Sequence, residues 1–577
     1  MDNGAILREQ CRNRILSNDY VDIITNLGDY KNELITQGSD SCLQQISENF
    51  LVVHNIRNEE TDYSIARYGY RAIPGLFTPA DMTSVNEIGA IRLRNQPALG
   101  LRGENVIIGF IDTGIDYRHP AFRYSNGESR IVRIWDQSVQ SGMTPEGIDY
   151  GSEYTKEMID EALGSENPLQ LVPSIDTNGH GTFLAGVAAG SVDEENDFTG
   201  VAPSAQIAVV KLKEAKANLR DYYLIKENME GVPVYQENDI MMGIKYLREL
   251  ALSLRLPIVI CIALQNNLGS HSGESFLSEY LNIISNSFGN IFVVAAGNMA
   301  NQRLHYEGSL SIGEKEDSVE VRVGPGQRGF CMELWGDSPD LYTITVTSPT
   351  GEVVPRITAG IGDENIYDFV FEETTLYVTY QMSVGYSGAE LIFMRFEAPT
   401  EGIWTVSVNN IRHVRGRFHM WLPNTEFIGT ETYFLRPEAN VTITSPANSF
   451  GPITVGAYNH YDGSIYLNSG RGYTRTDLIK PDFVAPGVDV YGPLPNNRYG
   501  RLSGTSIAAA HTAGAAALLA EWGLDNDEFE LLQNQNVKTF LIRGAKQDNV
   551  ENRIYPNREW GYGKLDVYES FLRFREV

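Results

Sequence analysis

The pattern of hydrophobic and polar positions changes several times along the 577 residues of the chain. From about residue 100, runs rich in Val and Ile show no alternation, as expected of parallel strands buried on both faces. Helical patterns such as residues 237–254 lie between these runs, so the sequence predicts an α/β unit with a parallel sheet. The runs are residues 104–114, 205–213, 256–264 and 290–298.

A different pattern occupies residues 305–447. Apolar and polar residues alternate there in short segments separated by Gly, Pro and Asp, which is typical of an all-β sandwich or jelly roll. Residues 453–459 and 482–494 return to the α/β pattern. The all-β unit is therefore predicted to be inserted into the α/β unit rather than attached to its end.

The first 80 residues alternate short helical patterns with short apolar strands, which predicts a small α/β unit. A looser stretch with Pro74, Gly75 and Pro79 suits a linker or a processing region. We therefore expect an N-terminal unit at 1–80, an α/β unit at 81–304 and 448–577, and an inserted all-β unit at 305–447.

The balance of charge bears on possible partners. The chain has 46 Lys and Arg residues against 74 Asp and Glu, and its net charge is −28. Nucleic acids and anionic membranes favour basic patches, so neither is expected as a partner. The sequence also shows no signal-peptide pattern and no apolar run near the ~18 residues of a membrane span, which predicts synthesis in the cytosol.

The cysteines and acidic residues give little support for a metal site. Cys11, Cys42, Cys261 and Cys331 are scattered without close spacing, so we expect reduced thiols, two or three of them buried. A disulfide framework or zinc site is not expected. The acidic segment 190–198 has poor ligand spacing for calcium and is interpreted as a solvated loop. No metal and no cofactor is predicted.

Three polar residues have positions that suit nucleophilic acyl transfer. Asp112 ends a buried strand, His180 begins a helix between two glycines, and Ser506 begins a helix of very small residues. Functional groups in open parallel sheets gather at the carboxyl ends of strands and at the helix starts that follow. A serine hydroxyl becomes nucleophilic when an imidazole takes its proton and a carboxylate orients that imidazole. A packed histidine, a capping serine and a turn-forming aspartate are the alternatives for the individual residues.

The sequences around these residues resemble the subtilisin-like serine proteases, which share the chain order Asp, His, Ser. The resemblance covers about residues 100–300 and 448–577 and implies a subtilisin-like parallel sheet with helices on both faces. Its motifs are DTG at 112–114, GHGT at 179–182, GVAP at 200–203, AAGN at 295–298, KPDFVAPG at 480–487, GTSIA at 504–508 and WGYGKLD at 560–566.

The resemblance also implies a role for each matching residue. Ser506 corresponds to the nucleophile, His180 to the general base, and Asp112 to the residue that orients it. The Asn298 side chain and the Ser506 N–H correspond to the oxyanion hole. The glycines beside His180 would let the helix start close under the edge of the sheet. The walls of the substrate-binding S1 pocket correspond to Ala263, Leu264 and Gln265 on one side and to Ala295, Ala296 and Gly297 on the other.

A narrower resemblance is to the clostridial Csp germination proteases, carried by residues 130–138, 153–163, 201–223 and 235–247. It implies that the N-terminal unit is a prodomain that acts as a folding chaperone. It further implies a monomer packaged in the spore, whose protein substrate is a cortex-hydrolase precursor. The looseness around residues 77–79 predicts that the prodomain is cut between residues 70 and 95.

One departure from this branch leaves a second hypothesis open. Gln265 stands where the branch usually has a glycine, on the strand that binds the substrate backbone. Its side chain could narrow the S1 pocket or contact the P1 residue directly. A blocked pocket would fit a catalytically silent scaffold for binding or signalling. The all-β insertion could bind a glycan or a partner protein, although bracing of the catalytic unit is favoured.

Overall fold

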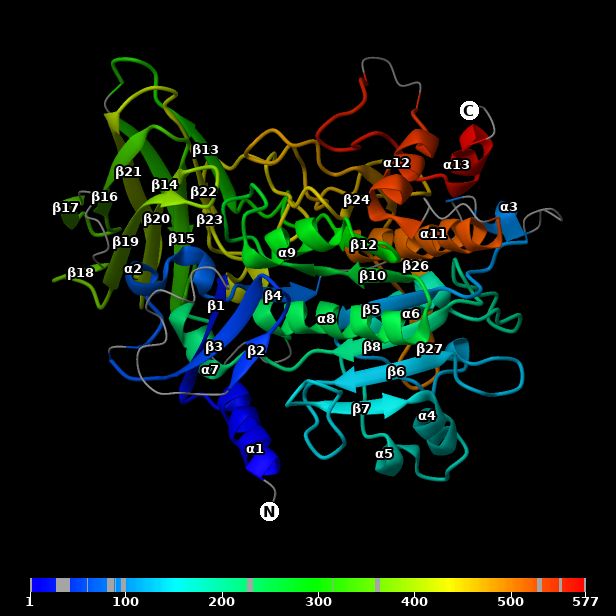
Figure 1. The fold of residues 1–577 in the computed structure, drawn as a ribbon. Helices are drawn as coiled ribbons and strands as arrows, with labels where there is room; N and C mark the ends of the chain where they lie inside the picture. Colours follow the sequence, from blue (N-terminus) through cyan, green and yellow to red (C-terminus); the bar gives the residue numbers. More distant parts are fainter. Residues whose placement is uncertain are drawn as a thin grey trace.

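The structure is a computed structural model that describes residues 3–26, 42–59, 61–79, 88, 90–94, 100–225, 232–314, 316–357, 364–526, 532–548 and 553–574. A sheet in the order β25-β24-β12-β10-β5-β8-β6-β7 lies at its centre (Figure 1). Every neighbouring pair is parallel except β6 and β7, which confirms the predicted fold class. The strands are β5 (Ile107–Asp112), β6 (Ile131–Asp136), β7 (Ser152–Thr155), β8 (Gln206–Lys211), β10 (Ile258–Ile262), β12 (Asn290–Ala295), β24 (Ile453–Tyr458) and β25 (Phe483–Pro486).

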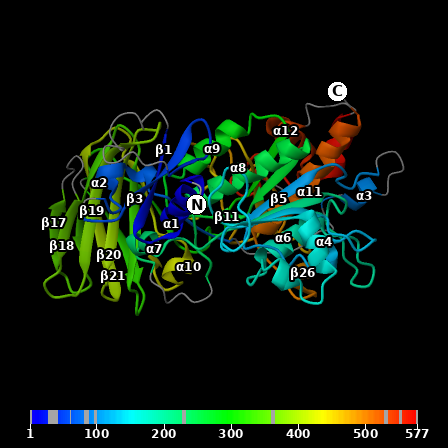
Figure 2. The same cartoon turned by 60° about the horizontal axis from the view of Figure 1, so that its bottom comes forward.

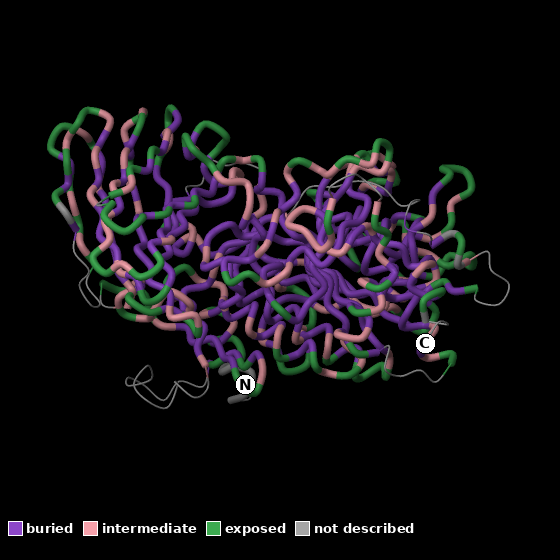
Figure 3. Tube along the Cα trace, turned by 90° about the horizontal axis from the view of Figure 1, so that it is seen from above, coloured by how far each residue is buried: buried purple, intermediate pink, exposed green. Residues whose placement is uncertain are grey.

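Helices cover both faces of this sheet, and the central strand β5 contributes to a core on each side. Ile107 and Ile111 pack in the same cluster as α8 and α9, whereas Ile108 and Phe110 pack with α6 and α11. Purple segments in Figure 3 show how much of the centre is buried. The helices of this unit are α3 (Ala90–Arg94), α4 (Lys156–Leu163), α5 (Pro168–Leu171), α6 (His180–Ala189), α7 (Ala217–Tyr222), α8 (Glu237–Leu254), α9 (Phe276–Ile284), α11 (Thr505–Asp525), α12 (Asn534–Gly544) and α13 (Val567–Phe574).

Two antiparallel sheets follow β12 and precede β24, which are neighbours in the parallel sheet. The all-β segment is therefore inserted between two adjacent parallel strands, as the sequence pattern predicts. One sheet has the order β13-β22-β15-β20-β19-β18 and the other β17-β16-β21-β14-β23. The elements are β13 (His305–Ser309), β14 (Glu316–Val323), β15 (Gly329–Gly336), β16 (Leu341–Thr347), β17 (Val353–Ile357), β18 (Glu364–Asp368), β19 (Thr375–Val384), β20 (Ala389–Glu397), β21 (Gly402–Arg412), β22 (Arg417–Trp421), α10 (Thr425–Ile428) and β23 (Tyr433–Phe434).

The N-terminal segment forms a small sheet that lies between the inserted sheets and α8 (Figure 2). Asp22 joins it to the α/β unit, because its carboxylate pairs with the Lys216 ammonium at 2.6 Å and accepts a hydrogen bond from the Gln236 amide. Burial would raise the pKa of Asp22, but Lys216 and then His54 lower it on balance. The elements are α1 (Asn3–Leu16), β1 (Tyr20–Asn26), β2 (Leu43–Gln45), β3 (Phe50–Ile56) and α2 (Ile65–Tyr68).

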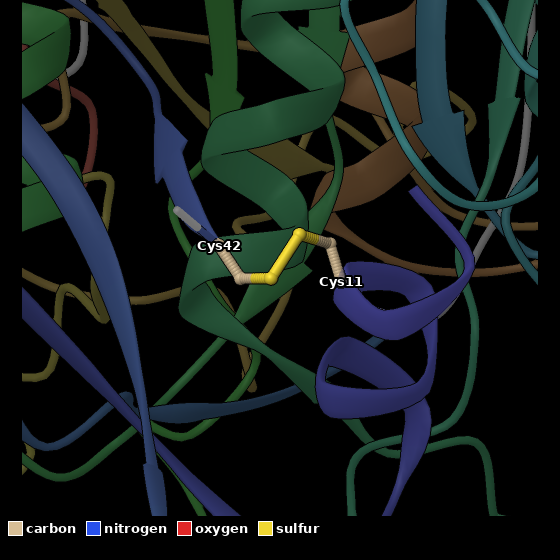
Figure 4. Close-up of a disulfide and its surroundings, with 2 residues drawn as sticks. All are labelled: Cys11 and Cys42. Carbon is tan, nitrogen blue, oxygen red and sulfur yellow. A yellow bond between two sulfur atoms is a disulfide. The ribbon is translucent and has the colours of Figure 1, made fainter. Parts of the chain in front are cut away.

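Cys11 and Cys42 form a disulfide within this N-terminal segment (Figure 4). The prediction that all the cysteines are reduced is therefore wrong for this pair. Helix α1 packs beside the start of β2 and brings the two Cα atoms to 5.0 Å, within the range of a disulfide. The cysteines are 31 residues apart in the sequence, and such a spacing does not reveal the contact. Cys261 and Cys331 are free, and burial raises the pKa of both thiols.

Shorter strands complete the structure. Three of them form a small sheet in the order β11-β4-β9, and two form the hairpin of β26 and β27. Within the described ranges, no helix is both long and apolar enough to cross a membrane. The strands are β4 (Leu76–Pro79), β9 (Tyr235–Gln236), β11 (Leu264–Gln265), β26 (Val490–Leu494) and β27 (Arg498–Leu502).

Three buried histidines surround Trp421 where the insertion meets the α/β unit. The His271 ring stacks on Trp421 with centroids 4.2 Å apart, and the His305 ring does so at 4.8 Å. His305 Nε2 also lies 2.9 Å from His419 Nδ1. Burial lowers the pKa of His271 to about 4 and that of His305 to about 3, and it also holds the pKa of His419 well below its ordinary value.

We expect this cluster to make the fold sensitive to acid. The folded state holds the imidazoles neutral, whereas in the unfolded chain they bind protons below their ordinary pKa of about 6.5. Their contribution to stability is thus complete above pH 6.5 and is lost as the pH falls toward the folded pKa values. The melting temperature should fall by roughly 5 °C between pH 7 and pH 5. In His419→Asn this fall should be smaller, and an unchanged fall would contradict the assignment.

Candidate active site

Asp112 and His180 form a close pair at the carboxyl end of the central strand. Asp112 is the last residue of β5 and is almost fully buried. Its Oδ1 lies 2.6 Å from His180 Nδ1 and also accepts a hydrogen bond from the Thr113 N–H. A carboxylate in this position favours the tautomer with the proton on Nδ1, in which Nε2 is the nitrogen that can accept a proton.

The glycines on either side of His180 are needed for the backbone conformation and for close packing. Gly179 has a φ of +94°, a conformation that residues with a side chain rarely adopt, and it precedes the first turn of α6. A Cβ on Gly181 would lie 2.1 Å from the Gly114 carbonyl oxygen. The first turn of α6 therefore lies directly against the Asp112-Thr113-Gly114 loop, and this contact allows His180 to reach Asp112.

Asp176 links these two segments, and the sequence analysis did not single it out. Its Oδ1 accepts hydrogen bonds from the Thr113 hydroxyl and the Gly179 N–H. Its Oδ2 accepts hydrogen bonds from the N–H and the hydroxyl of Thr182. An Asp shortly before a helix start is a common turn and capping signal, and this is the pattern that could have identified it.

Ser506 is the second residue of α11 and has no solvent exposure. This helix packs against α6, and its small residues allow a close approach to the surrounding chain. At Gly514 a Cβ would lie 2.4 Å from the Val201 side chain. Ser506 thus sits in the first turn, where backbone N–H groups have no partner within the helix and the helix dipole favours negative charge.

Asn298 lies beside Ser506, and the two polar atoms of its side-chain amide have different surroundings. Its Oδ1 accepts hydrogen bonds from the N–H and the hydroxyl of Thr505, each at 3.1 Å. Its Nδ2 is buried and has no hydrogen-bond partner in the part of the chain that the structure describes. A buried amide donor without a partner is costly, and its position next to Ser506 suits an oxyanion.

The residues predicted to line the S1 pocket also come together. Ala263 and β11 lie beyond the end of β10, and Ala295, Ala296 and Gly297 lie at the end of β12, the neighbouring strand. The Gln265 side chain extends from β11 toward the second wall, where its Oε1 accepts a hydrogen bond from the Asn298 N–H at 2.8 Å.

An extended piece of the N-terminal segment lies along the first wall. Strand β4 pairs antiparallel with β11, placing Leu264 opposite Pro79 and Gln265 opposite Thr78. On its other side β4 pairs antiparallel with β9. Residues 80–87, which follow β4, lie outside the described residues, as does much of the predicted cut region.

The described residues contain no group of three or more His, Cys, Asp and Glu side chains placed to hold a metal ion. The polar side chains at this edge of the sheet are instead Asp112, His180 and Asn298, beside the first turn of α11.

The fold is that of the subtilases, and the chain belongs to the subtilase family. The family model matches residues 103–351 and 406–563. Among solved structures the chain is similar to the CspB protease of Clostridium perfringens, with a TM-score of 0.75 and 31% sequence identity. That match covers 85% of this chain and 98% of the other.

Curated relatives share parts of the sequence. The PIII-type proteinase of Lactococcus lactis subsp. cremoris (strain SK11) is 22% identical over 543 residues, which cover 81% of this chain and 25% of the relative. The thermophilic serine proteinase of Bacillus sp. (strain AK1) is 42% identical over 130 residues, 22% of this chain and 27% of the relative. The chain thus spans about a quarter of the length of these relatives.

Proposed function

We propose that the chain hydrolyses peptide bonds with Ser506 as nucleophile, His180 as general base and Asp112 as the residue that orients His180. The observation that carries this proposal is the 2.6 Å contact between Asp112 and His180, beside α11, whose second residue is Ser506. In the first step His180 Nε2 takes the Ser506 proton while the hydroxyl oxygen attacks the substrate carbonyl.

The tetrahedral intermediate places negative charge on the former carbonyl oxygen. The buried Nδ2 of Asn298 and the Ser506 N–H are proposed to donate hydrogen bonds to it. His180 then gives its proton to the leaving amine, and an acyl-enzyme remains on Ser506. Water, deprotonated by His180, releases the acyl group and restores the hydroxyl.

We further propose that substrates bind as an extended strand between β11 and β9, in the place that β4 occupies. Because Pro79 pairs with Leu264 in an antiparallel arrangement, the next residue of a bound strand would lie opposite Ala263. In the sequence of this chain, Ala80 follows Pro79. The proposed site of autoprocessing is therefore the bond between Ala80 and Asp81, which would make residues 1–80 a prodomain. Activation of a spore-cortex hydrolase precursor, implied by the sequence resemblance, stays a prediction.

A fluorophosphonate probe tests the nucleophile directly. We expect the native protein to acquire one covalent label, and the peptide that contains Ser506 to carry it, because only an activated serine attacks such a probe. Ser506→Ala and heat-denatured protein are the unlabelled controls. A chain that neither labels nor cuts itself would instead favour the catalytically silent scaffold.

A further inference from the structure

The Gln265 side chain bridges the two segments that are predicted to form the walls of the S1 pocket. It leaves β11, is fully buried, and its Oε1 accepts the hydrogen bond from the Asn298 N–H on the opposite wall. Its other amide atom, Nε2, donates to Glu426 Oε1 at 3.4 Å. Both ends of the amide thus have a hydrogen-bond partner, which fixes the side chain between β11 and the segment that follows β12.

The insertion provides the support on the far side. Glu426 belongs to α10, and Asn424, the residue before this helix, donates its Nδ2 to the Gln265 carbonyl oxygen at 3.2 Å. Asn424 Oδ1 also accepts the Asn267 N–H at 2.7 Å. Backbone and side chain of Gln265 are both tied to the same short segment of the insertion, which fixes the position of β11.

The opposite wall, residues 295–297, is closely packed against Thr444. Gly297 has a φ of +94°, and a Cβ there would lie 2.2 Å from the Thr444 hydroxyl oxygen. The Ala296 carbonyl accepts hydrogen bonds from the N–H and the hydroxyl of Thr444, at 3.1 and 3.3 Å. A bulky side chain that entered between the walls would have to displace either Gln265 or the wall that Thr444 supports. Overpacking of this kind is destabilising.

We propose that Gln265, held by Glu426 of the insertion, fills much of the S1 pocket and restricts cleavage to bonds that follow a small residue. This inference rests on the proposed function and gives its substrate class: extended segments with Gly, Ala or Ser before the scissile bond. In the proposed autoprocessing site, the residue before the scissile bond is Ala80, which is small. The insertion thereby takes part in substrate selection through Asn424 and Glu426.

Autoprocessing of the full chain tests the proposal without a foreign substrate. We expect Ala80→Phe to cut itself roughly 100-fold more slowly than the natural chain, because the ring has no space beside Gln265. Ala80→Ser should still be cut. In the double variant Ala80→Phe with Gln265→Gly, the cut should return to within about 10-fold of the natural rate. The matched control pairs Ala80→Phe with Gln265→Met, which keeps the length of the side chain and should not restore the cut.

Time courses of intact mass provide the readout, and each outcome has a clear meaning. Rapid cutting of Ala80→Phe, or no recovery with Gln265→Gly, overturns the proposed pocket and leaves the catalytic proposal standing. Recovery with Gln265→Met would show that the hydrogen bonds of Gln265, and not its bulk, set the preference, which also overturns it. If the natural chain neither cuts itself nor takes the fluorophosphonate label, the proposed function fails and this inference fails with it.

Discussion

Ser506→Ala is expected to stay whole, whereas the natural chain is expected to separate into residues 1–80 and 81–577. Without the hydroxyl no acyl-enzyme forms, and the remaining groups of such a triad cannot replace it, so the cut should slow by about 10⁶-fold. Intact-mass measurement of both proteins, purified identically, gives the result. The masses of the two fragments also locate the bond, because they identify the residue after which the chain is cut.

The control for this experiment is Ser253→Ala. Ser253 is an exposed serine of α8, so its loss should leave the cut unchanged. If Ser506→Ala were also cut, another protease would be responsible. A cut at a bond other than Ala80–Asp81 would show that the pairing of β4 with β11 is not the pairing of a cleavage product in the active site.

The sequence alone predicts the fold class because its signals are local. Continuous apolar runs identify the buried parallel strands, and the change to alternation marks the insertion between β12 and β24. The motifs around Asp112, His180 and Ser506 are equally local, since each places one polar residue at a strand end or a helix start. Local patterns thus find the members of the candidate site, and the structure supplies the contact between Asp112 and His180.

Two features that the sequence analysis missed depend on contacts between distant segments. The disulfide joins Cys11 to Cys42, which only the packing of α1 on the N-terminal sheet brings together. Gln265 could be recognised as unusual, but its partner Glu426 is 161 residues away, within the insertion. Spacing in the sequence carries no information on such pairs, because each one is created by how two units pack.

The Asp112→Asn variant is expected to lower the rate of autoprocessing by about 10⁴-fold at neutral pH. The amide removes the negative charge that, in the proposed mechanism, stabilises the imidazolium form of His180. Its NH₂ group can also donate to Nδ1, which holds the tautomer that is unable to take the Ser506 proton. The side chain keeps its shape in the buried site, so the melting temperature should change much less than the rate.

The rate is followed by the mass time course, with Asp462→Asn as the control because Asp462 is exposed and lies outside the site. A rate near that of the natural chain would show that Asp112 does not orient the base. The double variant Asp112→Asn with Ser506→Ala should be no slower than Ser506→Ala alone, because a carboxylate that acts only through His180 and Ser506 has no effect once the nucleophile is gone. A further loss in the double variant would mean that Asp112 contributes by a route that does not pass through Ser506.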